Sequence, residues 1–234
     1  MPNGPKNAIP NRELTAEFKN KWDLDLTTIN NLQELAEKHG CKLVVRGGLA
    51  TEAFAGGHLT RSHNDIDARF LNTSKLSDDE IFKLVEKVME TDKTDWKLYS
   101  SKPEKIEYRE KEDERPFFNR RRLELYIASE TDIDPSKRKL FYTDGLSIEV
   151  FVPEFYRFVA EKFKKLFMVN DKPEEAERES NLSDYTDLKR LINTAGFDAE
   201  RTKKELANII KYFDNPVEEA VREYNFIMDL LSQV

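Results

Sequence analysis

The stretch VVRGGLATEAFAGGHLTRSHNDIDARF, residues 44–70, decides the fold of this chain. It begins with an apolar run, turns at the pair Gly47 and Gly48, and ends with Asp65 and Asp67, which one residue separates. A buried strand, a tight turn, a helix and a second strand are expected in that order, because short apolar runs, paired glycines and alternating residues are typical of these elements. The stretch therefore predicts a mixed α/β unit.

The aspartate pair predicts a metal site. Asp65 and Asp67 are two residues apart on an expected strand, so their side chains point to the same face. Two carboxylates held side by side repel each other, and a hard divalent cation relieves that repulsion. Mg²⁺ suits this role because it binds carboxylate oxygens together with substrate phosphates.

The glycine pair predicts an anion site. A strand that runs through Gly47 and Gly48 into a helix exposes backbone N–H groups at the helix N-terminus, where side chains would obstruct a ligand. A lone Gly-Gly is usually only a turn, and a lone Asp-x-Asp is common on surfaces. Their occurrence together after a strand indicates metal-assisted phosphoryl chemistry.

Composition limits the class of protein. The 234 residues suffice for one large domain or two small ones. The net charge of −7 argues against a general nucleic-acid coat protein, although it leaves room for a local basic patch. The single cysteine, Cys41, excludes an internal disulfide, and we interpret it as a small core residue of a protein in a reducing compartment. No apolar stretch approaches the roughly 18 residues of a membrane span. The first dozen residues are polar, so a soluble cytoplasmic protein without membrane partners is expected.

The periodicity predicts an α+β chain with a mixed sheet flanked by helices, followed by a bundle of helices. We expect a flexible lead-in over 1–24, a mixed domain over 25–152 and a helical domain over 153–234. Helices are expected at 26–40, 49–55, 76–91, 153–168, 183–196, 198–213 and 216–231. Strands are expected at 41–46, 65–71, 95–100, 104–110 and 120–129, and a hairpin at 139–151 turns at Asp144-Gly145. The helix over 76–91 begins with a capping box made by Ser77 and Glu80.

The stretch GGLATEAFAGGHLTRSHNDID resembles the signature of the DNA polymerase β-like nucleotidyltransferase superfamily. Within it, the sequence is most similar to the aminoglycoside nucleotidyltransferases and to the abortive-infection type nucleotidyltransferase toxins. The resemblance implies the nucleotidyltransferase fold and the transfer of a nucleoside monophosphate from an NTP to an acceptor hydroxyl. It also implies a site with two Mg²⁺ ions.

The same resemblance implies roles for individual residues. It assigns the triphosphate to Gly47, Gly48 and Thr51. It makes Asp65 and Asp67 the ligands of Mg²⁺. Arg61 matches the family arginine ahead of the aspartates, and its alternative is a surface salt bridge. His63 either orients Asp65 or contacts the nucleotide, and its alternative is to cap the turn.

Family members carry a third carboxylate on a later strand, where it completes the metal site and serves as a general base. Glu124 in RRLELYIA and Glu149 in LSIEVFVP are the two candidates. We favour Glu124, because in the resembling families this strand precedes a hairpin that leads to the helical domain. The family often has aspartate here, so the extra methylene of Glu124 leaves the metal geometry open.

The helical half resembles the toxin branch, in which a lysine helix precedes a helix with two aspartates. Lys162 matches the lysine that reaches the triphosphate, and Asp184 and Asp187 match the aspartates. Ser183 replaces the usual arginine, which weakens the match. The alternatives are a solvated lysine face for Lys162 and an ordinary acid of the first helical turn for Asp184.

The sequence does not decide between two classes of acceptor. A small aminoglycoside-like acceptor is polycationic and suits an acidic protein. An RNA acceptor needs a basic groove, for which the runs NRRR (119–122) and SKRK (136–139) are candidates. The toxin branch adds an antitoxin protein as a candidate partner. A module of the same fold that binds nucleotide or protein without catalysis is the alternative function.

Overall fold

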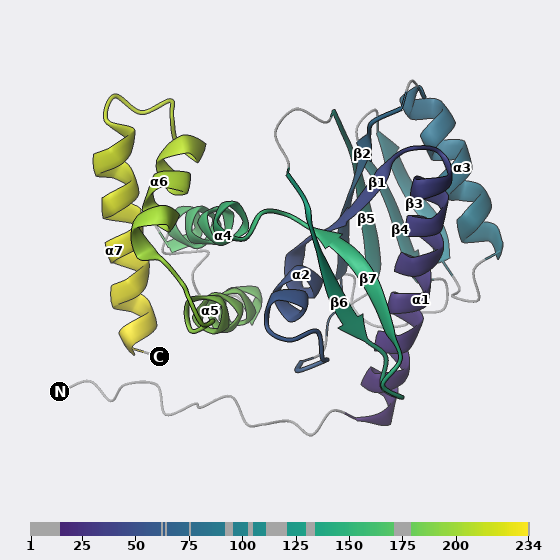
Figure 1. Ribbon diagram of the computed structural model, residues 1–234, viewed down its shortest axis with the longest axis horizontal. Helices are drawn as coiled ribbons and strands as arrows, with labels where there is room; N and C mark the ends of the chain where they lie inside the picture. The colour runs from purple at the N-terminus through teal and green to yellow at the C-terminus, as the bar shows by residue number, and fades with distance from the viewer. Residues whose placement is uncertain are drawn as a thin grey trace. The chain divides into compact units, whose positions relative to one another are not determined.

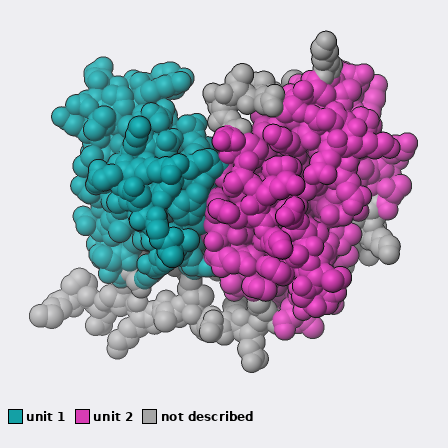
Figure 2. Space-filling view, in the orientation of Figure 1, with its two compact units in different colours: residues 1–12, 154–234 teal, residues 13–153 magenta. Residues whose placement is uncertain are grey.

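The computed structural model describes residues 15–61, 63, 65–74, 76–91, 96–102, 105–110, 121–129, 134–170 and 179–233. These residues form two compact units, shown in different colours in Figure 2. The first unit ends at Pro153, and the second begins at Glu154.

The chain is helical earlier than the sequence suggested. Helix α1 spans Ala16–Lys38, and the side chain of Thr15 caps it by accepting a hydrogen bond from Phe18 N. The expected lead-in over 1–24 is therefore wrong from Ala16 onward, and residues 1–14 lie outside the described part of the chain. Trp22 explains the difference, because it is buried on the same face as the apolar residues that follow it and extends their helical spacing toward the N-terminus.

The remaining elements of the first unit follow the predicted order and type. They are β1 (Lys42–Val45), α2 (Gly47–Phe54), β2 (Asp65–Asn72), α3 (Asp78–Thr91), β3 (Trp96–Lys102), β4 (Lys105–Glu110), β5 (Arg122–Ser129), β6 (Ser136–Phe141) and β7 (Ser147–Val152). The predicted capping box of α3 is confirmed. Ser77 N donates to Glu80 Oε2 at 2.8 Å, and Glu80 N donates to Ser77 Oγ at 3.3 Å.

The strands form one seven-stranded mixed sheet in the order β3-β4-β5-β2-β1-β7-β6. Strand β2 pairs antiparallel with β1 and parallel with β5, and β1 pairs parallel with β7. Strand β2 therefore lies at the centre of the sheet, with β5 as its neighbour on one side.

Strand β2 has one core face and one polar face. Ile66, Ala68 and Phe70 are buried, whereas Asp65 and Asp67 between and before them are only half-buried. Helices α1 and α3 pack side by side in this unit, and α2 packs against β2 (Figure 1). The alternation leaves the aspartates on the face opposite the buried side chains.

The second unit contains the predicted helices: α4 (Phe155–Asn170), α5 (Glu179–Ile192), α6 (Ala199–Ile209) and α7 (Pro216–Gln233). Helix α4 contacts the other three, and Phe163 on α4 stacks on Tyr224 of α7 with ring centroids 4.9 Å apart. The prediction of an α+β chain with a mixed sheet and a C-terminal helical domain is confirmed. Among the described helices, none combines the length and apolar character needed to cross a bilayer.

Candidate active site

Gly47 permits the carboxylate of Asp67 to approach the start of α2. Its φ of +59° is in the left-handed region, which favours glycine. A Cβ at this position would come within 3.0 Å of Asp67 Oδ2. The backbone fixes the approach as well, because Arg46 N donates to Asp67 O at 2.7 Å. The turn after β1 thus needs glycine for both conformation and space.

Gly48 leaves space for two further side chains of the motif. A Cβ here would come within 3.0 Å of His63 Nδ1 and of Arg61 Nη2. The glycine pair therefore brings Arg61, His63 and Asp67 together at the N-terminus of α2, as the motif suggested. Arg46 provides no side-chain cap for this helix, so the first-turn N–H groups of α2 lack that partner.

Thr51 lies inside α2 and is buried, and its hydroxyl donates to Gly47 O at 3.3 Å. The side chain thus contacts the backbone of the glycine turn one helical turn upstream. This position connects Thr51 with the glycine pair.

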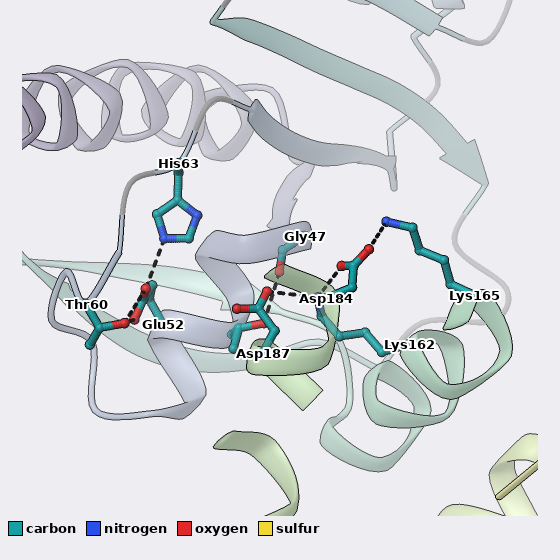
Figure 3. Close-up of polar contacts among 9 residues, drawn as sticks. Gly47, Glu52, Thr60, His63, Lys162, Lys165, Asp184 and Asp187 are labelled. Carbon is teal, nitrogen blue, oxygen red and sulfur yellow. Dashed lines mark hydrogen bonds and ion pairs between the residues drawn. The ribbon is translucent and has the colours of Figure 1, made fainter. Parts of the chain in front are cut away.

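A buried carboxylate orients His63. Glu52 of α2 has 0% exposure, and its Oε1 lies 3.0 Å from His63 Nε2 (Figure 3). Thr60 Oγ1 donates to both carboxylate oxygens of Glu52, at 2.8 and 3.0 Å. The imidazole is therefore held by its Nε2 side while Nδ1 lies beside Gly48. Sequence reasoning missed Glu52 and Thr60, although Glu52 is the one charged residue of the apolar helix GGLATEAF.

The register of β2 and β5 brings Glu124 next to Asp67. In this parallel pair, Asp65 is the partner of Arg122 and Asp67 is the partner of Glu124. Partners in register on neighbouring strands share a face, so Glu124 extends the row of carboxylates on β2. This is the position expected of a third carboxylate.

Glu149 lies elsewhere in the sheet. It is on β7, which β1 separates from β2. Its carboxylate is exposed and lies 3.4 Å from Lys137 Nζ on β6. Of the two candidates, the structure brings Glu124 and not Glu149 beside the aspartates.

Two basic side chains bind these carboxylates: Arg122, from the run NRRR that was a candidate for a basic groove, and Lys105, which sequence reasoning did not single out. Arg122 donates from Nε to Asp65 Oδ1 at 2.8 Å and from Nη2 to Asp65 Oδ2 at 3.0 Å. Lys105 Nζ on β4 lies 2.8 Å from Glu124 Oε1, and Arg122 Nη1 lies 3.4 Å from the same oxygen. Asp65 and Glu124 are thus each paired with a basic side chain.

The pKa values follow from these contacts. The hydrogen bonds to Asp65 raise the pKa of Arg122 above its ordinary value despite partial burial. Burial raises the pKa of Glu124, but the bond from Lys105 and the charge of Arg122 outweigh it, so the pKa lies below its ordinary value of 4.5. Glu124 is therefore a carboxylate at neutral pH and accepts hydrogen bonds only.

Asp65, Asp67 and Glu124 lie on one face of two adjacent strands. Their carboxylate oxygens are of the ligand type that Mg²⁺ prefers. Because Gly47 has no Cβ, the space beside Asp67 Oδ2 stays open. Among the described residues, however, no group of three or more His, Cys, Asp or Glu side chains is arranged around a common ion position. In this structure Asp65 is instead bound by Arg122, and Glu124 by Lys105.

In the second unit, Lys162 is buried in a cluster of charges. Its Nζ lies 3.3 Å from Asp184 Oδ1 and 3.0 Å from Asp187 Oδ2, and Lys165 Nζ lies 2.5 Å from Asp184 Oδ2 (Figure 3). Lys162 is 7% exposed, so it is not part of a solvated lysine face. Lys162, Asp184 and Asp187, which the family resemblance singled out, thus lie in one cluster of charges.

Two solved structures of the same antibiotic-resistance factor, ANT(2'')-Ia, share this fold. Its solution structure is 16% identical, with a TM-score of 0.50, and the alignment covers 80% of this chain and 91% of that one. Its crystal structure in complex with adenylyl-2''-tobramycin is 16% identical, with a TM-score of 0.51, and covers 80% of this chain and 97% of that one. This likeness shows that the chain has the fold of that nucleotidyl-transferring resistance factor.

A family model matches part of the chain by sequence. Residues 28–115 match the model described as aminoglycoside-2''-adenylyltransferase. The matched segment contains the glycine pair and both aspartates. Over this segment the chain is similar to the aminoglycoside nucleotidyltransferases. No curated protein matches the chain by sequence.

Proposed function

We propose that this protein transfers a nucleoside monophosphate from an NTP to a hydroxyl of a small polycationic acceptor of the aminoglycoside type, with the help of Mg²⁺. The observation that carries the proposal is the position of Asp67. Its carboxylate lies against Gly47 at the N-terminus of α2 and in register with Glu124 on β5. A triphosphate bound at the helix N-terminus would thus meet the carboxylate row directly.

The proposed binding groups come from the glycine turn and the motif that follows it. The N–H groups of the first turn of α2 are suited to phosphate oxygens, and Arg61 and His63 lie beside Gly48. Asp65, Asp67 and Glu124 would hold Mg²⁺, which supplies charge neutralisation for the phosphates when it is bound. Lys162 and Asp184 enter the proposal through the family resemblance alone.

In the proposed reaction, the acceptor hydroxyl oxygen forms a bond to the α-phosphorus of the NTP. The bond from that phosphorus to the bridging oxygen breaks, and pyrophosphate leaves. The hydroxyl proton passes to a carboxylate, and Glu124 is placed for this role because it is ionised and adjacent to Asp67.

Charge and similarity favour the aminoglycoside-type acceptor. The net charge of −7 suits a polycationic molecule. The family model that matches residues 28–115 is described by its transfer of adenylate to an aminoglycoside. We infer an ATP donor from the same description.

The RNA alternative receives less support from the basic runs. In NRRR, Arg121 is buried against Asp25, and Arg122 binds Asp65, while Asn119 and Arg120 lie outside the described residues. In SKRK, the residues lie on β6, which β2, β1 and β7 separate from β5. The two runs therefore lie on strands that are not neighbours in the sheet. A single basic groove would favour runs on adjacent strands.

The test is a transfer assay with ATP labelled in its α-phosphate, Mg²⁺ and either an aminoglycoside or total RNA. Label on the aminoglycoside supports the proposal, whereas label on RNA supports the toxin-type reaction and justifies a search for an antitoxin partner. An absence of label from both acceptors and from the protein itself would favour a binding module.

Asp65→Asn and Asp67→Asn test the metal ligands. Each is expected to lower transfer at least roughly 100-fold, because the loss of a metal ligand removes several kcal/mol of transition-state stabilisation. Asp79→Asn, an exposed change in the first turn of α3, is the matched control and should retain activity. Circular dichroism establishes that each variant keeps the fold. Turnover near wild type in either active-site variant would contradict the metal-site assignment.

A further inference from the structure

Arg122 occupies both oxygens of a proposed metal ligand. Nε donates to Asp65 Oδ1 and Nη2 donates to Asp65 Oδ2, so the guanidinium forms a two-bond fork on the carboxylate. Forked arginine–carboxylate pairs have a defined geometry and are stronger than single contacts. An ion that binds at Asp65 must use oxygens that Arg122 already contacts, and two cations on one carboxylate repel each other.

The sheet register places Arg122 in this position. Arg122 on β5 is the direct partner of Asp65 on β2, and Glu124 is the direct partner of Asp67. The same guanidinium extends to Glu124, with Nη1 3.4 Å from Oε1. A single basic side chain therefore contacts two of the three proposed ligands.

We propose that Arg122 is a built-in counter-cation of the metal site, which a divalent ion must displace from Asp65 in order to bind. This inference rests on the proposed function. It explains why the donor set has the chemistry of a magnesium site while its side chains do not converge on a common position. The proposal also gives the like charges of Asp65 and Asp67 a common counter-charge in Arg122.

The pair of Asp65 and Arg122, at which the proposed exchange takes place, is accessible to solvent. The side chains of Asp65 and Arg122 are 38% and 43% exposed. Pairs with this exposure are held by modest energies, so a hard divalent ion with higher charge density competes effectively. Arg122 therefore sets the affinity for the metal rather than preventing its binding.

The test measures Mn²⁺ binding by electron paramagnetic resonance, without nucleotide and without turnover. Arg122→Gln should bind Mn²⁺ about fivefold to tenfold more tightly than wild type, since the competing fork is lost. Arg122→Lys keeps the charge but not the fork, so it should lie between the two.

Arg109→Gln is the matched control. Arg109 on β4 is the direct partner of Arg122 in the sheet register, and it binds Glu107 with Nε 2.6 Å from Oε1. This change removes the same charge from the same face without touching Asp65. Equal tightening in Arg122→Gln and Arg109→Gln would overturn the proposal, because the effect would then be general electrostatics. Weaker binding in Arg122→Gln would also overturn it.

A double-mutant comparison isolates the contact. In an Asp65→Asn background, Arg122→Gln should change Mn²⁺ affinity much less than it does in wild type, because the fork is already lost and only the 3.4 Å contact with Glu124 remains. An undiminished Arg122 effect in that background contradicts the proposal while leaving the metal site in place. No Mn²⁺ binding in wild type and all variants would instead contradict the proposed metal dependence, and the counter-cation with it.

Discussion

His63 Nε2 lies 3.0 Å from Glu52 Oε1, and both side chains are buried beside the glycine turn. Thr60 donates to the same carboxylate, so Glu52 accepts from two directions inside the protein. The motif residue His63 therefore owes its orientation to a helix residue that precedes it in the chain. This relationship leads to the first prediction.

Glu52→Ala should lower the free energy of unfolding of the first unit by about 2 kcal/mol, because it leaves the buried imidazole of His63 and the hydroxyl of Thr60 without this acceptor. Glu52→Gln should cost less, since its amide oxygen still accepts one bond. Both tryptophans, Trp22 and Trp96, lie in the first unit, so urea unfolding followed by tryptophan fluorescence reports on this unit. Wild-type stability in Glu52→Ala would show that the network contributes nothing.

Gly48→Ala should weaken triphosphate binding while the backbone stays unstrained. The new methyl group would collide with His63 and Arg61, and Gly48 does not have a positive φ. Gly145→Ala at the tip of the β6–β7 hairpin is the control, because it has φ of +90° and no neighbour within 4 Å. The control should lose stability but keep binding, as measured by titration with a non-hydrolysable ATP analogue. Unchanged affinity in Gly48→Ala would remove the phosphate site from the glycine pair.

Glu124→Gln should lose the chemical step yet retain ATP binding, because the carboxylate is needed where the acceptor hydroxyl gives up its proton. Glu149→Gln should retain activity and change stability by less than about 0.5 kcal/mol, since its pair with Lys137 is exposed. Single-turnover kinetics separates binding from chemistry in both variants. An inactive Glu149→Gln beside an active Glu124→Gln would reverse the assignment.

Lys162→Ala should destabilise the helical unit by about 3 kcal/mol, because it leaves Asp184 and Asp187 without their buried partner. Lys165→Ala should have a small effect, since that side chain is mostly exposed. Far-UV circular dichroism during urea unfolding reports on the helices of both units, whereas tryptophan fluorescence reports on the first unit alone, so a change in the first signal without a change in the second assigns the effect to the helical unit.

The same pair of variants tests the resemblance to the lysine that reaches the triphosphate. Under conditions where both are folded, Lys162→Ala should raise the dissociation constant for ATP far more than Lys165→Ala does. Equal small effects on ATP binding would mean that Lys162 has a purely structural role.

The sequence was sufficient where local pattern determines structure. The glycine pair and the spacing of Asp65 and Asp67 predicted the strand, turn, helix and strand, and the order of elements in the resembling families favoured Glu124 over Glu149. It was insufficient where partners come from distant segments. Arg122 and Asp65 are 57 residues apart, and only the pairing of β2 with β5 brings them together. Glu52 was overlooked because a single acid in a short apolar helix gives no sign of its partners.

The parallel pairing of β2 with β5 also makes the site vulnerable to an error in folding. Side chains alternate between faces, so a slip of β5 by one residue would present Leu123 or Leu125 to Asp67 and turn Glu124 into the core. The cost of exposing these two leucines, both buried in the native sheet, protects the correct alignment. The fidelity of assembly at this site is therefore encoded in residues that never meet a substrate.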